Sequence, residues 1–202
     1  MVSSSSTTIE RIAKTERITK ETSVIVEVNI DGTGKTTIKT GLPFYDHLVT
    51  SIGKHANIDI ILTAESKDSV IHHLVEDISI ALSQTIDKAL GDRSHIMRFG
   101  YAMVPMDESL AYVTIDLVKR QFYVIQLKLS RDTVEGMPRE DIEHFIRSLA
   151  QNLNACTHII VEYGDNDHHK IESVVKAFAV SLRMAASLDR KSEGVPSTKG
   201  AM

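Results

Sequence analysis

The chain has 202 residues, of which 42% are hydrophobic and 25% charged, and its formal net charge is −4. These values fit an ordinary globular protein with one large core or two small ones, and the mild acidity gives no reason to expect nucleic acid or an anionic membrane as a partner. No apolar run approaches the length that spans a membrane. The single cysteine, Cys156, cannot form an intrachain disulfide, so a reducing cytoplasm is the simplest location.

The first half of the chain is predicted to contain strands followed by two helices. Strands are expected in four segments that are rich in β-branched residues, namely 9–17, 22–29, 35–40 and 57–63. A short helix that carries His47 precedes the last of these strands. A second helix is expected to begin near His72, with Asp68 or Ser69 as its cap, and to end at Gly91.

The second half repeats this order. Strands are expected at 98–104, 110–117, 122–129 and 157–163, with a loop at 135–138. One helix carries His144 and another follows the last strand, where Asp165, Asn166 and Asp167 are all suitable caps. Two β-β-β-α-β-α units predict an α+β fold with an internal duplication, in which helices cover one face of each sheet.

The same pattern divides the chain into segments. Residues 1–8, mostly Ser and Thr, are expected to form a disordered tail rather than a signal peptide. Residues 9–92 and 93–190 are the two halves. Residues 191–202 are interpreted as a flexible C-terminal tail that becomes ordered when it binds substrate.

The strongest functional signal is a pair of adjacent histidines at the start of the last helix of each half. His72-His73-Leu74-Val75-Glu76 and His168-His169-Lys170-Ile171-Glu172 both place a glutamate within reach of a metal ion on either ring. A lone histidine, His47 or His144, stands 25 or 24 residues before each pair, and a shift of 96 or 97 positions superimposes the two sets. This duplication predicts metal ligands rather than solvated residues. The eight predicted ligands are His47, His72, His73, Glu76, His144, His168, His169 and Glu172.

The two histidines of a pair lie roughly 100° apart around a helix and are expected to serve different ions. Six imidazoles and two carboxylates divide into two sites of about three imidazoles and one carboxylate each, which suit Mn, Fe, Co or Zn. Open positions on an octahedral ion would bind substrate, so the residues indicate a two-metal enzyme of unspecified reaction. The alternatives are a two-metal hydrolase acting on a phosphorylated small molecule, or a structural oligomer that metal only cross-links.

Several cationic and hydroxyl residues suggest that the substrate carries a phosphate. Ser197-Thr198-Lys199-Gly200 offers two hydroxyls and an ammonium in the tail, and Lys176 lies one helical turn after Glu172. Arg98 and Arg120 stand at or near strand ends. If these groups converge, they suit a phosphate monoester.

Eight segments, in order along nearly the whole chain, carry a family resemblance. They are Thr19-Lys20-Glu21-Thr22, Asp31-Gly32-Thr33-Gly34, Phe44-Tyr45-Asp46-His47, His72-His73-Leu74-Val75-Glu76-Asp77, Met106-Asp107-Glu108-Ser109-Leu110-Ala111, Glu143-His144-Phe145, Asn166-Asp167-His168-His169-Lys170-Ile171-Glu172 and Pro196-Ser197-Thr198-Lys199-Gly200. With them the chain resembles the imidazoleglycerol-phosphate dehydratases of histidine biosynthesis. It departs from the family at Lys119-Arg120-Gln121, where Gly-Arg-Pro is usual, and at Val180-Ser181, where an arginine often stands.

The resemblance implies a reaction and a set of residues for it. D-erythro-imidazole glycerol phosphate would lose water to give imidazole acetol phosphate, through a metal-bridged imidazolate and a diazafulvene-like intermediate, with two Mn²⁺ per subunit. The implied assembly is a homo-oligomer of 24 subunits with active sites between chains, each half of a chain being of the ribosomal protein S5 domain 2-like type. The resemblance assigns proton transfer to Glu21, with Glu108 as the next candidate, while Asp77 and Asp107 suit hydrogen bonds to ligands. The substrate and phosphate would be held by Glu21, Arg98, Arg120, Lys176, Ser197 and Lys199.

Overall fold

The computed structural model describes residues 11–189, 191 and 194–197. The predicted tail at 1–8 and Lys199 lie outside the described residues. Apart from one short additional hairpin in the second half, strands and helices follow one another in the predicted order. The first half contains β1 (Ile12–Ile18), β2 (Thr22–Asn29), β3 (Thr36–Lys39), α1 (Pro43–Ala56), β4 (Asp59–Ser66) and α2 (Ile71–Leu90). The second contains β5 (Phe99–Met106), β6 (Ser109–Asp116), β7 (Phe122–Gln126), β8 (Thr133–Val134), β9 (Met137–Pro138), α3 (Arg139–Gln151), β10 (Cys156–Tyr163) and α4 (Asp167–Ala186).

The two main sheets have the same topology. Their strand orders are β1-β2-β4-β3 and β5-β6-β10-β7, and in each sheet only the last neighbouring pair, β3 with β4 or β7 with β10, runs parallel. The two orders correspond strand for strand. The internal duplication expected from the histidine spacing is therefore present in the fold itself.

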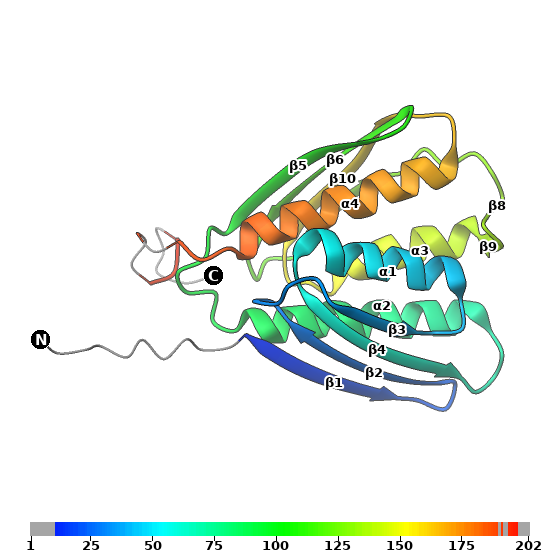
Figure 1. Ribbon diagram of the computed structural model, residues 1–202, viewed down its shortest axis with the longest axis horizontal. Helices are drawn as coiled ribbons and strands as arrows, with labels where there is room; N and C mark the ends of the chain where they lie inside the picture. The colour runs from blue at the N-terminus through cyan, green and yellow to red at the C-terminus, as the bar shows by residue number, and fades with distance from the viewer. Residues whose placement is uncertain (1–10, 190, 192–193, 198–202) are drawn as a thin grey trace, which may run out of the picture.

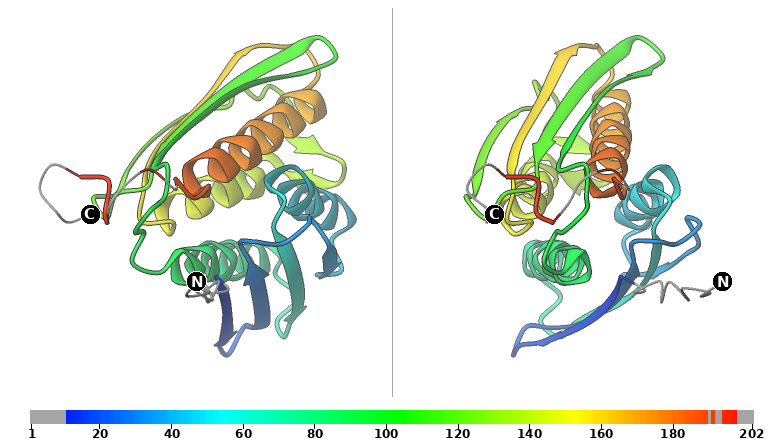
Figure 2. Two further views of the ribbon diagram at one scale, coloured as in Figure 1. Left: turned by 60° about the vertical axis from the view of Figure 1, so that its left-hand side comes forward. Right: turned by 90° about the vertical axis from the view of Figure 1, so that its left-hand side faces the viewer.

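The four helices lie in the middle of the molecule, between the two sheets (Figures 1 and 2). Helices α1 and α2 pack on the first sheet and α3 and α4 on the second, while α1 contacts α4 and α2 contacts α3. Alternate residues of the strands, such as Val24, Val26 and Val28, are fully buried beneath the helices. One apolar core runs through both halves. Helices thus cover one face of each sheet, as predicted.

Three local expectations need correction. Helix α2 begins at Ile71 with Val70 as its N-cap, and neither Asp68 nor Ser69 caps it, because the Asp68 carboxylate accepts a hydrogen bond from the Val70 N–H instead. Strand β7 ends before Lys128, whose positive φ of 53° interrupts the extended backbone. The predicted loop at 135–138 is part of the β8–β9 hairpin.

Other expectations are confirmed. The side chain of Asn166 caps α4 by accepting a hydrogen bond from the His168 N–H. Among the described helices, none is both long and apolar enough to cross a membrane.

Candidate metal centre

The contact between α1 and α4 brings three predicted ligands together in what we call site A, consisting of His47, His168 and Glu172. His47 Nε2 and His168 Nε2 lie 2.7 and 3.1 Å from the same oxygen, Glu172 Oε1. Phe44 packs beside the His168 ring, with ring centroids 5.1 Å apart. Site A opens into a cleft of ≈ 370 Å³. It therefore has room for a ligand beside the three side chains.

The contact between α2 and α3 creates the corresponding site B, consisting of His72, Glu76 and His144. The ring centroids of His72 and His144 are 4.6 Å apart, and His144 Nε2 lies 3.5 Å from Glu76 Oε1. This nitrogen is buried and has no hydrogen-bond partner among the described residues. Leaving a buried polar atom unpaired is costly, and a bound cation would satisfy it. The residues of site B thus fit a metal ion.

Each site combines a lone histidine from one half with a histidine and a glutamate from the other. In both sites, ligand atoms of all three residues lie within 4.8 Å of one another. Sequence spacing predicted about three imidazoles and one carboxylate per site, whereas one chain brings together two imidazoles and one carboxylate. The other two predicted ligands, His73 and His169, lie outside these two groups, with ring centroids 6.5 and 6.0 Å from those of His72 and His168 and ring planes inclined by 66° and 82°. Adjacent histidines thus contact different side chains: His72 groups with Glu76 and His144, and His73 lies beside Asp68.

His73 and His169 occupy equivalent positions in the two halves. Asp68 Oδ2 lies 2.6 Å from His73 Nδ1, and Glu21 Oε2 is 3.7 Å from the same nitrogen. In the second half, Glu108 Oε2 lies 2.6 Å from His169 Nδ1. Glu21 therefore stands outside sites A and B, as expected, but next to a predicted ligand.

The two aspartates suited to hydrogen bonds with ligands differ. Asp107 Oδ2 lies 3.4 Å from His169 Nε2 and is thus beside a predicted ligand. Asp77 is not: its carboxylate accepts hydrogen bonds from Arg17 Nε at 2.5 Å and from the hydroxyls of Thr19 and Thr22. Asp77 therefore fixes the β1–β2 turn that carries Glu21, and the expectation for it was wrong in the choice of partner.

Local hydrogen bonds shift the pKa values of several carboxylates and histidines in and beside sites A and B. Burial alone would raise the pKa of Glu172, but hydrogen bonds from Lys176, His47 and His168 lower it to about 2. Hydrogen bonding to Glu108 raises the pKa of His169, and the same contact holds the pKa of Glu108 well below its usual range. The hydrogen bond to Asp68 likewise raises the pKa of His73. The carboxylates of Glu172 and Glu108 are therefore ionised at neutral pH.

The predicted phosphate-binding residues do not gather in one chain. Lys176 Nζ lies 2.5 Å from Glu172 Oε2 and so reaches site A. Arg98 pairs with Asp116 at 2.7 Å and donates a hydrogen bond to the Pro196 carbonyl, next to Ser197. Its backbone N–H bonds to the carbonyl of Ala185 at the far end of α4, so roughly 25 Å of helix separates Arg98 from His168.

Arg120 lies in the exposed β6–β7 connection at the end of the sheet where Arg98 stands. Arg98, Arg120 and Ser197 thus lie near one end of the second sheet, away from site A, whereas Lys176, in the middle of α4, reaches site A.

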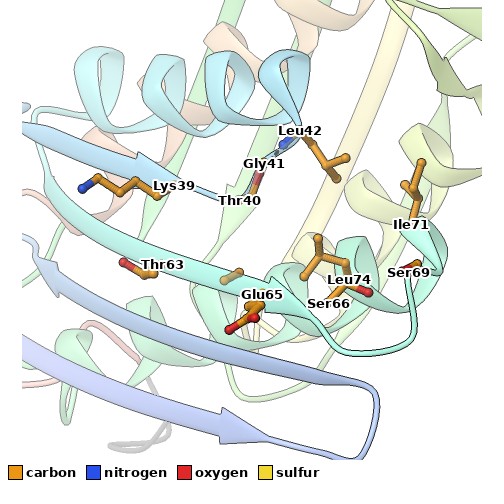
Figure 3. Close-up of a pocket in the computed structure, with 11 residues that line it drawn as sticks. Lys39, Thr40, Gly41, Leu42, Thr63, Glu65, Ser66, Ser69, Ile71 and Leu74 are labelled. Carbon is orange, nitrogen blue, oxygen red and sulfur yellow. Dashed lines mark hydrogen bonds between the residues drawn. The ribbon is translucent and has the colours of Figure 1, made fainter.

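A second cleft, of ≈ 550 Å³, lies between the end of the first sheet and the start of α2 (Figure 3). Leu42, Ile71 and Leu74 project into it beside Thr40 and Ser69. None of the eight predicted ligands is among the described residues that line it. The lining of this cleft is therefore separate from sites A and B.

Four carboxylates contact the paired histidines, and the sequence did not identify them as partners of these rings. Asp68, Glu108, Glu135 and Asp141 each contact one histidine of a pair. They stand in turns or at a helix start, at no constant distance from the histidines along the chain. Only Glu108 was flagged by a motif, and there for another role.

Comparison with known proteins identifies the family of the chain. The sequence profile of the family described as imidazoleglycerol-phosphate dehydratase (IGPD) matches residues 40–182. The chain is 44% identical over 192 residues to the enzyme of that name from Chlorobium phaeovibrioides, covering 94% of both chains, and 45% identical over 194 residues to that of Methanococcoides burtonii, covering 95% of this chain and all of the relative.

Solved structures agree as well. The IGPD of Pyrococcus furiosus matches with a TM-score of 0.79 and 33% identity over 93% of this chain and all of that one. The Staphylococcus aureus enzyme matches with a TM-score of 0.78 and 31% identity over 88% of this chain and 98% of that one. The chain therefore belongs to the imidazoleglycerol-phosphate dehydratase family.

Proposed function

We propose that this chain catalyses the dehydration of D-erythro-imidazole glycerol phosphate to imidazole acetol phosphate, a step of histidine biosynthesis, in the cytoplasm. Family membership over most of the chain supports the reaction. The observation that carries it is the pair of equivalent ligand groups, sites A and B, each built from both halves. A substrate with an imidazole ring has two ring nitrogens, which suits a protein with two cation sites.

We infer that two Mn²⁺ ions bind per subunit. Imidazole and carboxylate ligands without thiolate suit a borderline divalent ion, and the buried, unpaired His144 Nε2 calls for a cation. When bound, the ions would supply the positive charge that favours loss of the N–H proton from the imidazole ring of the substrate. Glu76 and Glu172, as ligands, would then be unavailable as bases.

The active sites are proposed to be completed between chains of a 24-subunit assembly. One chain offers three ligands at each site, while His73 and His169 face elsewhere and are partly exposed. Arg98 and Ser197, roughly 25 Å along α4 from site A, would meet a phosphate bound at the site of a neighbouring subunit. Lys176 would contact the phosphate of a substrate bound at site A of its own subunit.

Proton transfer is proposed for Glu21. A general base needs a carboxylate that is within reach of substrate and is not engaged by stronger partners. The Glu21 side chain is 53% exposed, and its turn is held in place by the Asp77 hydrogen bonds. Glu21 Oε2 lies 3.7 Å from His73 Nδ1, longer than a hydrogen bond. Glu21 can therefore both be positioned and accept a proton.

A product assay tests the proposal. The protein is stripped of metal with a chelator, reloaded with Mn²⁺ and incubated with imidazole glycerol phosphate. We expect the keto product to form, without release of inorganic phosphate, only after reloading. Release of phosphate would instead identify a two-metal hydrolase, and a protein that binds metal and assembles without turnover would be structural.

A further inference from the structure

The four paired histidines share a feature that their sequence does not show. Each directs its Nδ1 at a carboxylate that comes from outside its own helix. The contacts are His72 with Asp141, His73 with Asp68 and His169 with Glu108, all at 2.6 Å, and His168 with Glu135 at 3.1 Å. Four contacts of one kind, made by carboxylates from different places in the two halves, point to a common role.

The role follows from the chemistry of the imidazole ring. A neutral imidazole has one N–H and one lone pair, and an ionised carboxylate can only accept a hydrogen bond. A carboxylate at Nδ1 therefore places the proton there and leaves the lone pair on Nε2. In site A it is indeed His168 Nε2 that meets Glu172. The same nitrogen is thus made available on all four rings.

We propose that Asp68, Glu108, Glu135 and Asp141 are positioning residues that hold the four paired histidines with Nε2 presented to metal. The inference rests on the proposed function, because it requires these histidines to bind metal. It extends that function by naming the carboxylates that prepare the ligands. Such hydrogen bonds fix the orientation of the ring and raise its basicity.

Two of the carboxylates are themselves held in a defined orientation. Glu108 Oε1 accepts the backbone N–H groups of Asp165 and Asn166, which leaves Oε2 for His169. Asp68 Oδ1 accepts the N–H of Val70, which leaves Oδ2 for His73.

The other two differ in burial. Asp141, on α3, is only 4% exposed where it meets His72 on α2. Glu135 is 55% exposed and makes the longest contact, so its contribution should be the smallest.

This geometry makes the amide variants informative. In Glu108→Gln, the two backbone donors retain the amide oxygen, so the NH₂ group faces His169 Nδ1. An NH₂ group can bond only to a lone pair, so the imidazole proton would move to Nε2 and block the nitrogen that binds metal. Asp68→Asn should act on His73 in the same way. Glu162→Gln, the same change at an exposed glutamate of β10, is the matched control.

The experiment measures Mn²⁺ affinity by chelator competition and imidazole protonation by ¹⁵N NMR of the metal-free protein. We expect Glu108→Gln and Asp68→Asn each to bind Mn²⁺ about 10–100-fold more weakly, the size found for such partners of metal ligands. Each should also lose one ring with a protonated Nδ1, and Glu162→Gln should change neither.

If wild-type protein binds Mn²⁺ and turns over substrate, two results would overturn this inference and leave the proposed function standing. One is an Mn²⁺ affinity within about threefold of wild type in both variants. The other is weaker Mn²⁺ binding with unchanged imidazole protonation, which would mean a merely structural role. Asp68→Asn keeps the test usable if Glu108→Gln fails to fold, because Asp68 lies in a surface loop. Wild-type protein without Mn²⁺ binding would overturn the proposed function and this inference with it.

Discussion

A buried ion pair fixes the start of the helix that carries His168 and His169. Asp167 is fully buried, and its Oδ1 accepts a hydrogen bond from Lys170 Nζ at 2.8 Å. Its Oδ2 accepts the backbone N–H groups of Ser130 and Arg131 at 2.8 and 2.7 Å. One carboxylate therefore ties the chain that follows β7 to the first turn of α4. We predict that both the stability of the protein and the geometry of the metal ligands depend on it.

The size of the effect follows from what each substitution leaves behind. In Asp167→Asn the amide oxygen can keep the two backbone bonds, but the NH₂ group then faces the ammonium of Lys170. That ammonium is buried, and among the described residues it then retains only the Lys128 carbonyl, at 2.9 Å. Removing one partner of a buried pair costs about 3–5 kcal/mol, because the other charge stays desolvated. The double variant Asp167→Asn/Lys170→Met removes the stranded charge and should be more stable than the single one.

Urea unfolding of the metal-free protein at a fixed concentration measures both variants. Burial alone would raise the pKa of Asp167, but hydrogen bonds from Lys170 and from the Arg131 and Ser130 N–H groups lower it below the usual value of an aspartate. The folded state thus favours the ionised form, so its stabilisation is present above about pH 4 and is lost as the pH falls through the lowered pKa. Wild type should lose this contribution on acidification, and Asp167→Asn should not. A single variant within about 0.5 kcal/mol of wild type, or a double variant less stable than the single one, would refute the reasoning.

Other variants and treatments test the proposed site. Glu21→Gln should keep metal content and substrate binding while kcat falls by about 10²–10⁴, and turnover within a few-fold of wild type would contradict its assignment. Lys199→Ala should weaken substrate binding by about 1.5–3 kcal/mol, seen as a higher KM, and an unchanged KM and kcat would exclude the residue. Metal analysis of protein purified without chelator should find about two ions per chain. A fully active protein with one ion per chain would rule out the two-site arrangement. Light scattering should show a large assembly that chelation breaks into smaller units, which a fully active monomer would contradict.

The elements could be predicted from the sequence because their signals are local. Strand alternation and helical periodicity depend on neighbouring residues, and the repeated spacing of the histidines is enough by itself to indicate the duplication. The separate directions of adjacent histidines follow from helix geometry alone. Local residue patterns and histidine spacing are therefore enough to predict the architecture of each half and to identify the candidate ligands.

The grouping of the ligands could not be predicted, since it depends on how the halves pack. His47 meets Glu172 only because α1 lies against α4, 125 residues further along the chain. Asp77 was misjudged for a related reason. It follows Glu76 on the same helix but lies about 100° further around it, so it faces the β1–β2 turn while Glu76 faces site B.

The β1–β2 and β5–β6 turns are equivalent in the duplicated fold, but the glutamates that they carry have different roles. The β1–β2 turn brings Glu21 to His73, and the β5–β6 turn brings Glu108 to His169. Glu108 is fully engaged by two backbone N–H groups and the imidazole, and its strongly lowered pKa makes it a poor proton acceptor.

Glu21 stands farther from its histidine, because Asp68 already occupies His73 Nδ1, and so its carboxylate stays available. Glu108 should therefore not replace Glu21 as the base, although its motif made it the next candidate. Loss of Glu21 should appear in kcat and loss of Glu108 in metal affinity. A variant of either residue that showed the opposite loss would mean that the two turns have been assigned the wrong way round.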